Sequence, residues 1–128
     1  MEKDFNSWNI LKKNLNRTGR VFFAHPREIW WCSLGVNVGF EQDGTGEVGE
    51  RPVLILKGFS QRVCWAVPLT TSTKKNPYHI SLGTVGGKEA FAIISQIRLI
   101  DTKRLVNKIG FIDKKSFDDT RKAVKDLI

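Results

Sequence analysis

The chain begins with apolar residues at helical spacing. This spacing predicts an amphipathic helix of about three turns, with Asp4 placed to cap its first turn. The apolar stripe must cover either the rest of this chain or a partner. Residues 16–27 are polar and basic, contain Pro26, and are predicted to form a connector. The stripe consists of Phe5, Trp8, Leu11 or Lys12, and Leu15.

From residue 28 onward, short runs of branched and aromatic residues alternate with glycine-rich and polar segments. Such runs at close spacing predict short strands and favour a small barrel or sandwich. The predicted strands are 29–34, 53–56, 63–69, 78–82, 90–94 and 97–100. Helical spacing returns after Asp113, which can cap a last helix. One face of that helix carries Phe117, Arg121, Val124 and Ile128.

Length and composition limit the class of protein. The 128 residues fit one domain, and no apolar run approaches the ~18 residues of a membrane span. The first residues lack the layout of a signal peptide, so we expect a soluble, cytoplasmic protein. Cys32 and Cys64 lie in apolar runs and are interpreted as buried thiols, with a disulfide left open. Two cysteines and two histidines, scattered along the chain, do not match the spacing of a zinc site.

The formal net charge of +8 is unevenly distributed. Residues 28–50 contain five acidic residues and no lysine or arginine, whereas residues 51–104 contain nine basic and two acidic residues. A basic surface suggests a polyanionic partner, with nucleic acid as the first candidate. On charge alone, a merely soluble basic protein is an equally good interpretation.

Gly44, Gly46 and Gly49 match the pattern of a dinucleotide-binding loop, but their context does not. That motif needs a strand before it, a helix after it and surroundings that tolerate phosphate. Here Asp43 and Glu47 lie in the same segment, and a strand-like run follows it. We therefore interpret the segment as a surface loop.

Three segments occur in a fixed order along the chain. The first contains R-E-I-W-W at 27–31, G-F-E-Q-D-G at 39–44 and R-P-V-L-I-L at 51–56. The second is V-P-L-T-T-S at 67–72, and the third is S-Q-I-R-L-I-D-T-K-R-L at 95–105. The ordered set resembles the MazF/PemK toxins of type II toxin–antitoxin systems. The resemblance covers about residues 27–128.

The resemblance implies a fold and an activity. The fold is α+β and mainly β: an SH3-like curled barrel at 27–128, with residues 1–26 as a helical extension and connector. The implied activity is metal-independent, sequence-selective cleavage of single-stranded RNA, leaving 2′,3′-cyclic phosphate and 5′-OH ends. The implied state is a homodimer without a cofactor, inhibited by an acidic MazE-like antitoxin.

The resemblance also assigns roles to particular residues. Arg51 is the expected stabiliser of the transition state, because a guanidinium suits phosphate oxygens. Taken alone, Arg51 would be interpreted as a strand-edge residue paired with Glu50 or Glu41. Thr70 is the expected donor to the scissile phosphate, although threonine is also common in strands. The expected RNA-binding residues are Gln42, Gly44, Thr71, Lys74, Lys75 and Gln96.

Two departures keep other functions open. Ser95 occupies a position that is acidic in some family members, so either Arg51 and Thr70 act alone or the rate is low. The segment between Glu41 and Arg51 is longer than usual, and its residues Glu47 and Glu50 could gate the groove. A non-cutting RNA- or protein-binding module is the main alternative. A gyrase-poisoning toxin on a related barrel is a more distant one.

Overall fold

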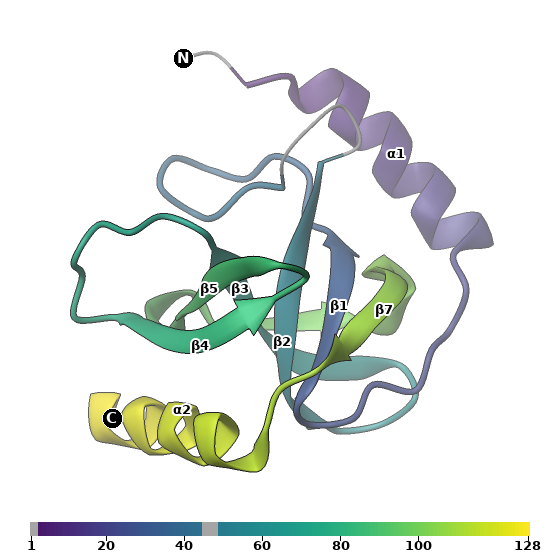
Figure 1. The fold of residues 1–128 in the computed structure, drawn as a ribbon. Helices are drawn as coiled ribbons and strands as arrows, with labels where there is room; N and C mark the ends of the chain where they lie inside the picture. The colour runs from purple at the N-terminus through teal and green to yellow at the C-terminus, as the bar shows by residue number, and fades with distance from the viewer. Residues whose placement is uncertain (1–2, 45–48) are drawn as a thin grey trace.

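The computed structural model describes residues 3–44 and 49–128, and forms one curled sheet with a helix near each terminus (Figure 1). The helices are α1 (Phe5–Thr18) and α2 (Lys114–Leu127). The strands are β1 (Glu28–Ser33), β2 (Glu50–Gly58), β3 (Val63–Thr70), β4 (His79–Val85), β5 (Lys88–Ile93), β6 (Arg98–Asp101) and β7 (Leu105–Phe111). Two short 3-10 helices, η1 (Ile94–Gln96) and η2 (Thr102–Arg104), flank β6.

The sheet is antiparallel in the order β4-β5-β3-β2-β1-β7, and β6 also pairs with β3. Strand β3 is shared: its first half pairs with β6, and its last two residues pair with β5. Because one strand serves three neighbours, the sheet curls on itself. This confirms the predicted mainly β, curled fold with a helix at each end.

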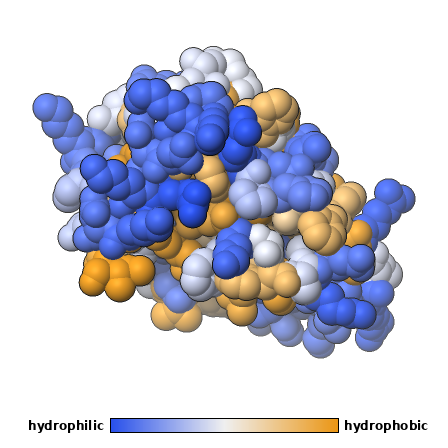
Figure 2. Space-filling view, turned by 90° about the horizontal axis from the view of Figure 1, so that it is seen from below, coloured by the Kyte–Doolittle hydropathy of each residue, from blue (hydrophilic) through white to orange (hydrophobic). Residues whose placement is uncertain are grey.

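Alternate residues of the central strands face two separate apolar clusters. Val53 and Ile55 belong to one cluster with Cys32 of β1, whereas Leu54 belongs to the other. The second cluster is completed by Phe117 of α2, so the last helix covers one face of the sheet. Seen from below the orientation of Figure 1, the molecular surface carries hydrophobic patches among hydrophilic side chains (Figure 2).

Both predicted helix caps are present. The carboxylate of Asp4 accepts from the Ser7 backbone N–H at 3.0 Å, and that of Asp113 accepts from Ser116 N–H at 3.0 Å. Helix α1 is 14 residues long, longer than predicted, and takes in part of the expected connector. The predicted face of α2 is confirmed, since one groove of about 460 Å³ is lined by its residues Phe117, Arg121 and Val124 and by Ile128, which follows the helix, among others.

Two details differ from the sequence prediction. Strand β7 was not predicted: Leu105 is buried, but the next residues are exposed and include Asn107 and Lys108, so the apolar pattern is weak. The stripe of α1 is also only partly buried. Trp8 is 6% exposed, whereas Phe5 remains 48% exposed. Helix α1 therefore docks mainly through one side chain.

Both cysteines are free, buried thiols. Burial raises the pKa of Cys32 to about 12 and that of Cys64 to about 11, so neither is a ready thiolate at neutral pH. No helix in the described part of the chain is long and apolar enough to cross a membrane.

Candidate functional site

The two predicted catalytic residues lie on neighbouring strands and on the same face of the sheet. Val53 of β2 pairs with Pro68 of β3, and continuing this antiparallel register by two residues sets Arg51 opposite Thr70. Residues paired across antiparallel strands point to the same side. The Arg51 Nη1 donates to the Leu69 carbonyl at 2.9 Å, which fixes the guanidinium beside the end of β3.

The Arg51 guanidinium contacts neutral oxygens within the described residues. Its Nε donates to the backbone carbonyl of Asp43 at 2.8 Å. In the orientation that satisfies the Gln42 amide, the Gln42 side-chain oxygen accepts from Arg51 Nη2 at 2.8 Å. Burial lowers the pKa of Arg51, and the charge of Asp43 partly offsets this. The group stays protonated and keeps its positive charge.

The carboxylate of Asp43 contacts Asn37 and Lys3. One oxygen accepts from the Asn37 N–H at 2.6 Å, and the other lies 3.0 Å from the Lys3 amine. Lys3 also donates to the carbonyl of Gly39 at 3.0 Å. An ion pair from the N-terminal segment therefore holds the acidic side chain of the loop that supplies two oxygens to Arg51.

A second tie fixes the same loop, which we define as residues 35–44 and call the tethered loop. Gly35 N–H donates to the Gly49 carbonyl at 2.8 Å, and Gly44 N–H donates to the Gly35 carbonyl at 2.7 Å. Gly35 has φ +62°, and a Cβ there would run into the Trp8 ring. The backbone of the loop therefore packs directly under helix α1. Gly46 and Glu47, the latter predicted to gate the groove, lie outside the described residues.

Gln96 links the tethered loop to η1. Its side-chain oxygen accepts from the Gln42 N–H at 3.2 Å, and its Nε2 donates to the Phe40 carbonyl at 3.1 Å. Gln42, Gln96 and Arg51 thus form one hydrogen-bonded group. Ser95, in the same 3-10 helix, is exposed.

Thr70 is half-buried, and its Oγ1 accepts from the Ser72 N–H at 3.1 Å. Accepting leaves the hydroxyl hydrogen available for donation. Thr71, Lys74 and Lys75 follow in an exposed segment, residues 71–78, which we call the local loop. The two lysines line an open pocket of about 420 Å³ together with Thr73, Asn76, Pro77, His79 and Phe91.

The structure therefore brings some predicted site residues together and leaves others apart. Arg51, Gln42 and Gln96 are directly linked, and Thr70 adjoins them through Leu69. The Gly44 amide closes the tethered loop. Lys74 and Lys75 lie in the local loop, which follows Thr70 along the chain, and make no hydrogen bond to this group within the described residues.

The alternative pairing of Arg51 with Glu41 is not observed. The Glu41 carboxylate instead accepts from the Val38 N–H at 2.9 Å. Sequence reasoning also missed the Lys3–Asp43 pair, since Lys3 belongs to no motif and lies 40 positions before Asp43.

A second group of cations lies at the docking site of α1. Arg104 donates to the Ser33 carbonyl at 3.2 Å and stacks 5.8 Å from the centre of the Trp8 ring. Burial lowers the pKa of Arg104, and the nearby charge of Arg98 lowers it further. These contacts give Arg104 a structural role where α1 packs on the sheet. Within residues 3–44 and 49–128, no three His, Cys, Asp or Glu side chains are placed to share a metal ion.

Comparison with known families decides the identity. The family model described as the PemK-like, MazF-like toxin of type II toxin–antitoxin systems matches residues 25–128. The chain belongs to this toxin family. Its N-terminal helix α1 lies outside the matched residues. A search of curated proteins finds no significant match.

Solved structures of MazF-like toxins share the fold at low sequence identity. MazF from Deinococcus radiodurans superposes with a TM-score of 0.67 at 18% identity, covering 83% of this chain and 96% of that one. An endoribonuclease from a mycobacterial species gives 0.63 at 14% identity, with 83% and 91% covered. The Mycobacterium tuberculosis toxin MazF-mt6 gives 0.61 at 16% identity, with 78% and 94% covered.

Proposed function

We propose that this MazF-like chain is a metal-independent endoribonuclease that cuts single-stranded RNA at selected sequences. The observation that carries the proposal is the half-buried Arg51, whose contacts in the described residues are neutral oxygens and which lies beside Thr70. A fixed cation whose hydrogen bonds among the described residues go to neutral oxygens is suited to bind a phosphate. Membership of a family of endoribonuclease toxins supports the same activity.

The reaction is a transfer within the RNA strand. The 2′-hydroxyl oxygen attacks the adjacent phosphorus and loses its proton, while the bond from phosphorus to the 5′ oxygen breaks and that oxygen gains a proton. The products are a 2′,3′-cyclic phosphate and a free 5′-hydroxyl. Negative charge accumulates on the phosphate oxygens in the transition state, where a preorganised cation is most effective.

Arg51 stabilises this charge, and Thr70 donates a hydrogen bond that holds the phosphate in line. Arg51 is a poor general base because an arginine keeps its proton at neutral pH. Ser95 is no better, since a serine hydroxyl is not basic at that pH. The protons therefore exchange with water, and we expect a modest rate that depends strongly on charge stabilisation.

The remaining predicted residues bind the RNA strand around the phosphate. Gln42 and Gln96 present amides to base edges, as in other proteins that read unpaired bases. Gly44 allows the loop to approach closely, Thr71 adds a hydroxyl next to Thr70, and Lys74 and Lys75 meet the backbone phosphates. No cofactor is needed for this chemistry.

We also propose the partners that the family suggests. The toxin MazF of Deinococcus radiodurans has been crystallised with MazE. For this chain we propose an acidic MazE-like antitoxin that competes with RNA for the basic groove, and a homodimer as the active form in the cytoplasm.

The test is cleavage of a long, mixed-sequence RNA by the purified protein in EDTA, alongside Arg51→Ala and Arg51→Lys. We expect a few discrete cuts with cyclic-phosphate and 5′-hydroxyl ends. Losing a transition-state charge contact should lower the rate at least about 100-fold in Arg51→Ala. Arg51→Lys should recover only part of it, because an ammonium lacks the planar fork.

If the wild type cuts no RNA but still binds RNA or an acidic peptide, the chain is instead a binding module on the toxin fold. Cleavage that persists in Arg51→Ala would show that this residue is not the stabilising cation. Binding by fluorescence anisotropy, measured on the same samples, separates the two outcomes.

A further inference from the structure

We propose that the pocket under the local loop is a binding subsite for one unstacked nucleobase of the RNA, next to the scissile phosphate. The inference rests on the proposed nuclease function and names how the same groove selects its substrate. Its central residue is Phe91 of β5, which belongs to none of the sequence motifs. The pocket measures about 420 Å³ and is open to solvent.

The sheet register places this pocket on the same face as the catalytic pair. Phe91 pairs with Thr70 across β3 and β5, and Ser81 pairs with Phe91 across β4 and β5. Paired residues share a face, so the ring of Phe91 projects to the side where Thr70 and Arg51 lie. A strand whose phosphate sits between Arg51 and Thr70 can therefore reach Phe91 with a neighbouring base.

The chemistry of the lining fits a base flanked by phosphates. Phe91 is half-buried, so its ring is held by the sheet while part of it remains accessible. Aromatic rings serve as platforms for unpaired bases, and Lys74 and Lys75 supply positive charge for the adjoining phosphates. The Nδ1 of His79 is buried without a hydrogen-bond partner in the described residues, so no such bond fixes the orientation of its ring. A ligand can set that orientation.

The test uses a single-stranded oligonucleotide that cannot be cut because it carries 2′-O-methyl groups, with 2-aminopurine placed at each position in turn. Stacking quenches 2-aminopurine, so one position beside the cleavage site should lose fluorescence on binding. Phe91→Ala should abolish that quenching and weaken binding about ten-fold. Phe91→Leu keeps the apolar volume, guards against misfolding and should show the same loss, whereas Phe91→Tyr should retain the quenching.

Phe111→Ala is the matched control, because that phenylalanine is 72% exposed on β7, at the opposite end of the sheet. Quenching that survives in Phe91→Leu, or a loss no larger than in Phe111→Ala, overturns the subsite. Cleavage of RNA tests the nuclease proposal separately. If the wild type cuts RNA but shows no quenching that depends on Phe91, the nuclease function stands and the subsite is wrong. If it shows that quenching but does not cut RNA, the subsite stands and the nuclease function is wrong.

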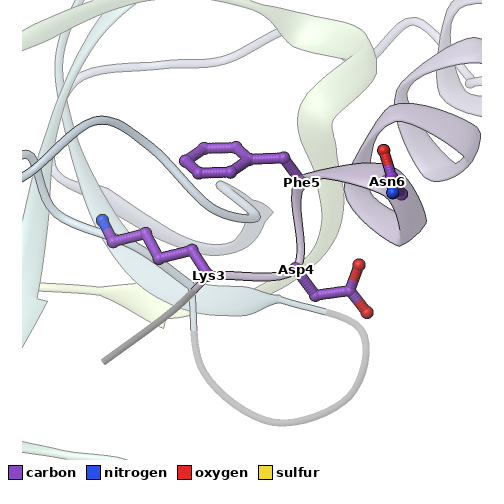
Figure 3. A pocket seen from close by; sticks show the side chains of 4 residues that line it. All are labelled: Lys3, Asp4, Phe5 and Asn6. Carbon is purple, nitrogen blue, oxygen red and sulfur yellow. The ribbon is translucent and has the colours of Figure 1, made fainter.

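A different observation carries a second inference: we propose that Lys3 is a positioning residue that keeps the Asp43 carboxylate away from Arg51. Figure 3 shows the Lys3 side chain extending away from that of Asp4, which caps α1. The Lys3 amine lies 3.1 Å from one oxygen of the Asp43 carboxylate and 3.0 Å from the other. The hydrogen bond that Arg51 donates to Asp43 goes to the backbone carbonyl and not to the carboxylate.

Removing the Lys3 amine would leave the Asp43 carboxylate free to pair with another cation. The carboxylate would keep the Asn37 N–H but lose its cation, and Arg51 already contacts the same residue. An acidic group next to a half-buried guanidinium pairs with it readily. Arg51, once paired with this carboxylate, would attract a phosphate less strongly.

The test measures binding of the same uncut oligonucleotide and cleavage of RNA, in Lys3→Met, Asp43→Asn and the double variant. We expect Lys3→Met to weaken binding about ten-fold, the loss that one charged contact supports. Asp43→Asn should bind as well as the wild type, and the double variant should regain wild-type binding. Lys3→Arg should behave as the wild type, and Lys13→Met is a control for net charge.

A purely structural ion pair gives a different pattern. Lys3→Met and Asp43→Asn would then weaken RNA binding equally, and the double variant would not regain wild-type binding. That result overturns the proposal, as does a Lys3→Met protein that binds normally. Binding without cutting in the wild type would count against the nuclease function alone.

Discussion

Two loops border the candidate site, and the structure holds them in different ways. The tethered loop, residues 35–44, is fixed from outside by Trp8 of α1 and by Gln96 of η1. In the local loop, residues 71–78, side-chain hydrogen bonds join residues two positions apart, as from Lys74 N–H to Ser72 Oγ at 3.4 Å. All its residues are exposed.

The two ways of holding the loops suit the different roles that we propose for them. The tethered loop supplies oxygens to Arg51, so its fixed geometry preorganises the cation before the RNA arrives. The local loop carries the lysines and lines the proposed base pocket, and its exposed residues can adjust when a base enters. We therefore expect changes that release the tethered loop to cost more than changes within the local loop.

The largest effect is expected from Trp8→Ala. Trp8 is 6% exposed and packs on Gly35, so truncation should lower the free energy of unfolding by about 3 kcal/mol. Urea unfolding measures this loss, and amide hydrogen exchange should show faster exchange at Asn37 and Gln42. Ile10→Ala is the control on the same helix, since Ile10 is 62% exposed. Unchanged exchange in Trp8→Ala would mean that the loop holds its own shape.

A matched pair of asparagines compares the loops directly. The Asn37 side chain donates to the carbonyls of Leu34 at 3.1 Å and Gln42 at 3.0 Å, bridging the tethered loop. The Asn76 side chain accepts from the nearby Tyr78 N–H at 2.9 Å, within the local loop. Asn37→Ala should therefore cost about 2 kcal/mol and Asn76→Ala about 0.5 kcal/mol of unfolding free energy. Equal losses in thermal or urea unfolding would remove the distinction between the loops.

The sequence predicted what depends on local pattern. The caps at Asp4 and Asp113, six of the strands and the last helix follow from spacing and side-chain chemistry. Strand β7 was missed because its exposed, partly polar residues leave little periodicity, and its place is set by pairing with β1.

The candidate site was predicted from ordered motifs, which named Arg51, Gln42 and Gln96. Its surroundings could not be predicted in this way. The Leu69 carbonyl that holds Arg51 is a backbone group that every residue possesses, and the Lys3–Asp43 pair joins segments brought together only by the docking of α1. Phe91 is inconspicuous in an apolar strand until pairing sets it beside Thr70.

The smallest effect is expected from Phe40→Ser, which removes a large apolar side chain from the tethered loop. Phe40 is 101% exposed, and Gln96 holds its backbone carbonyl rather than its ring. The free energy of unfolding should therefore change by less than about 0.5 kcal/mol, and the exchange of the Gln42 amide should stay slow. A decrease in unfolding free energy of more than about 1 kcal/mol would mean that the ring packs against the protein in solution, because losses of that size follow from removing a buried side chain. The tethered loop would then be stabilised by its own tip as well as by α1, and its dependence on Trp8 would be correspondingly weaker.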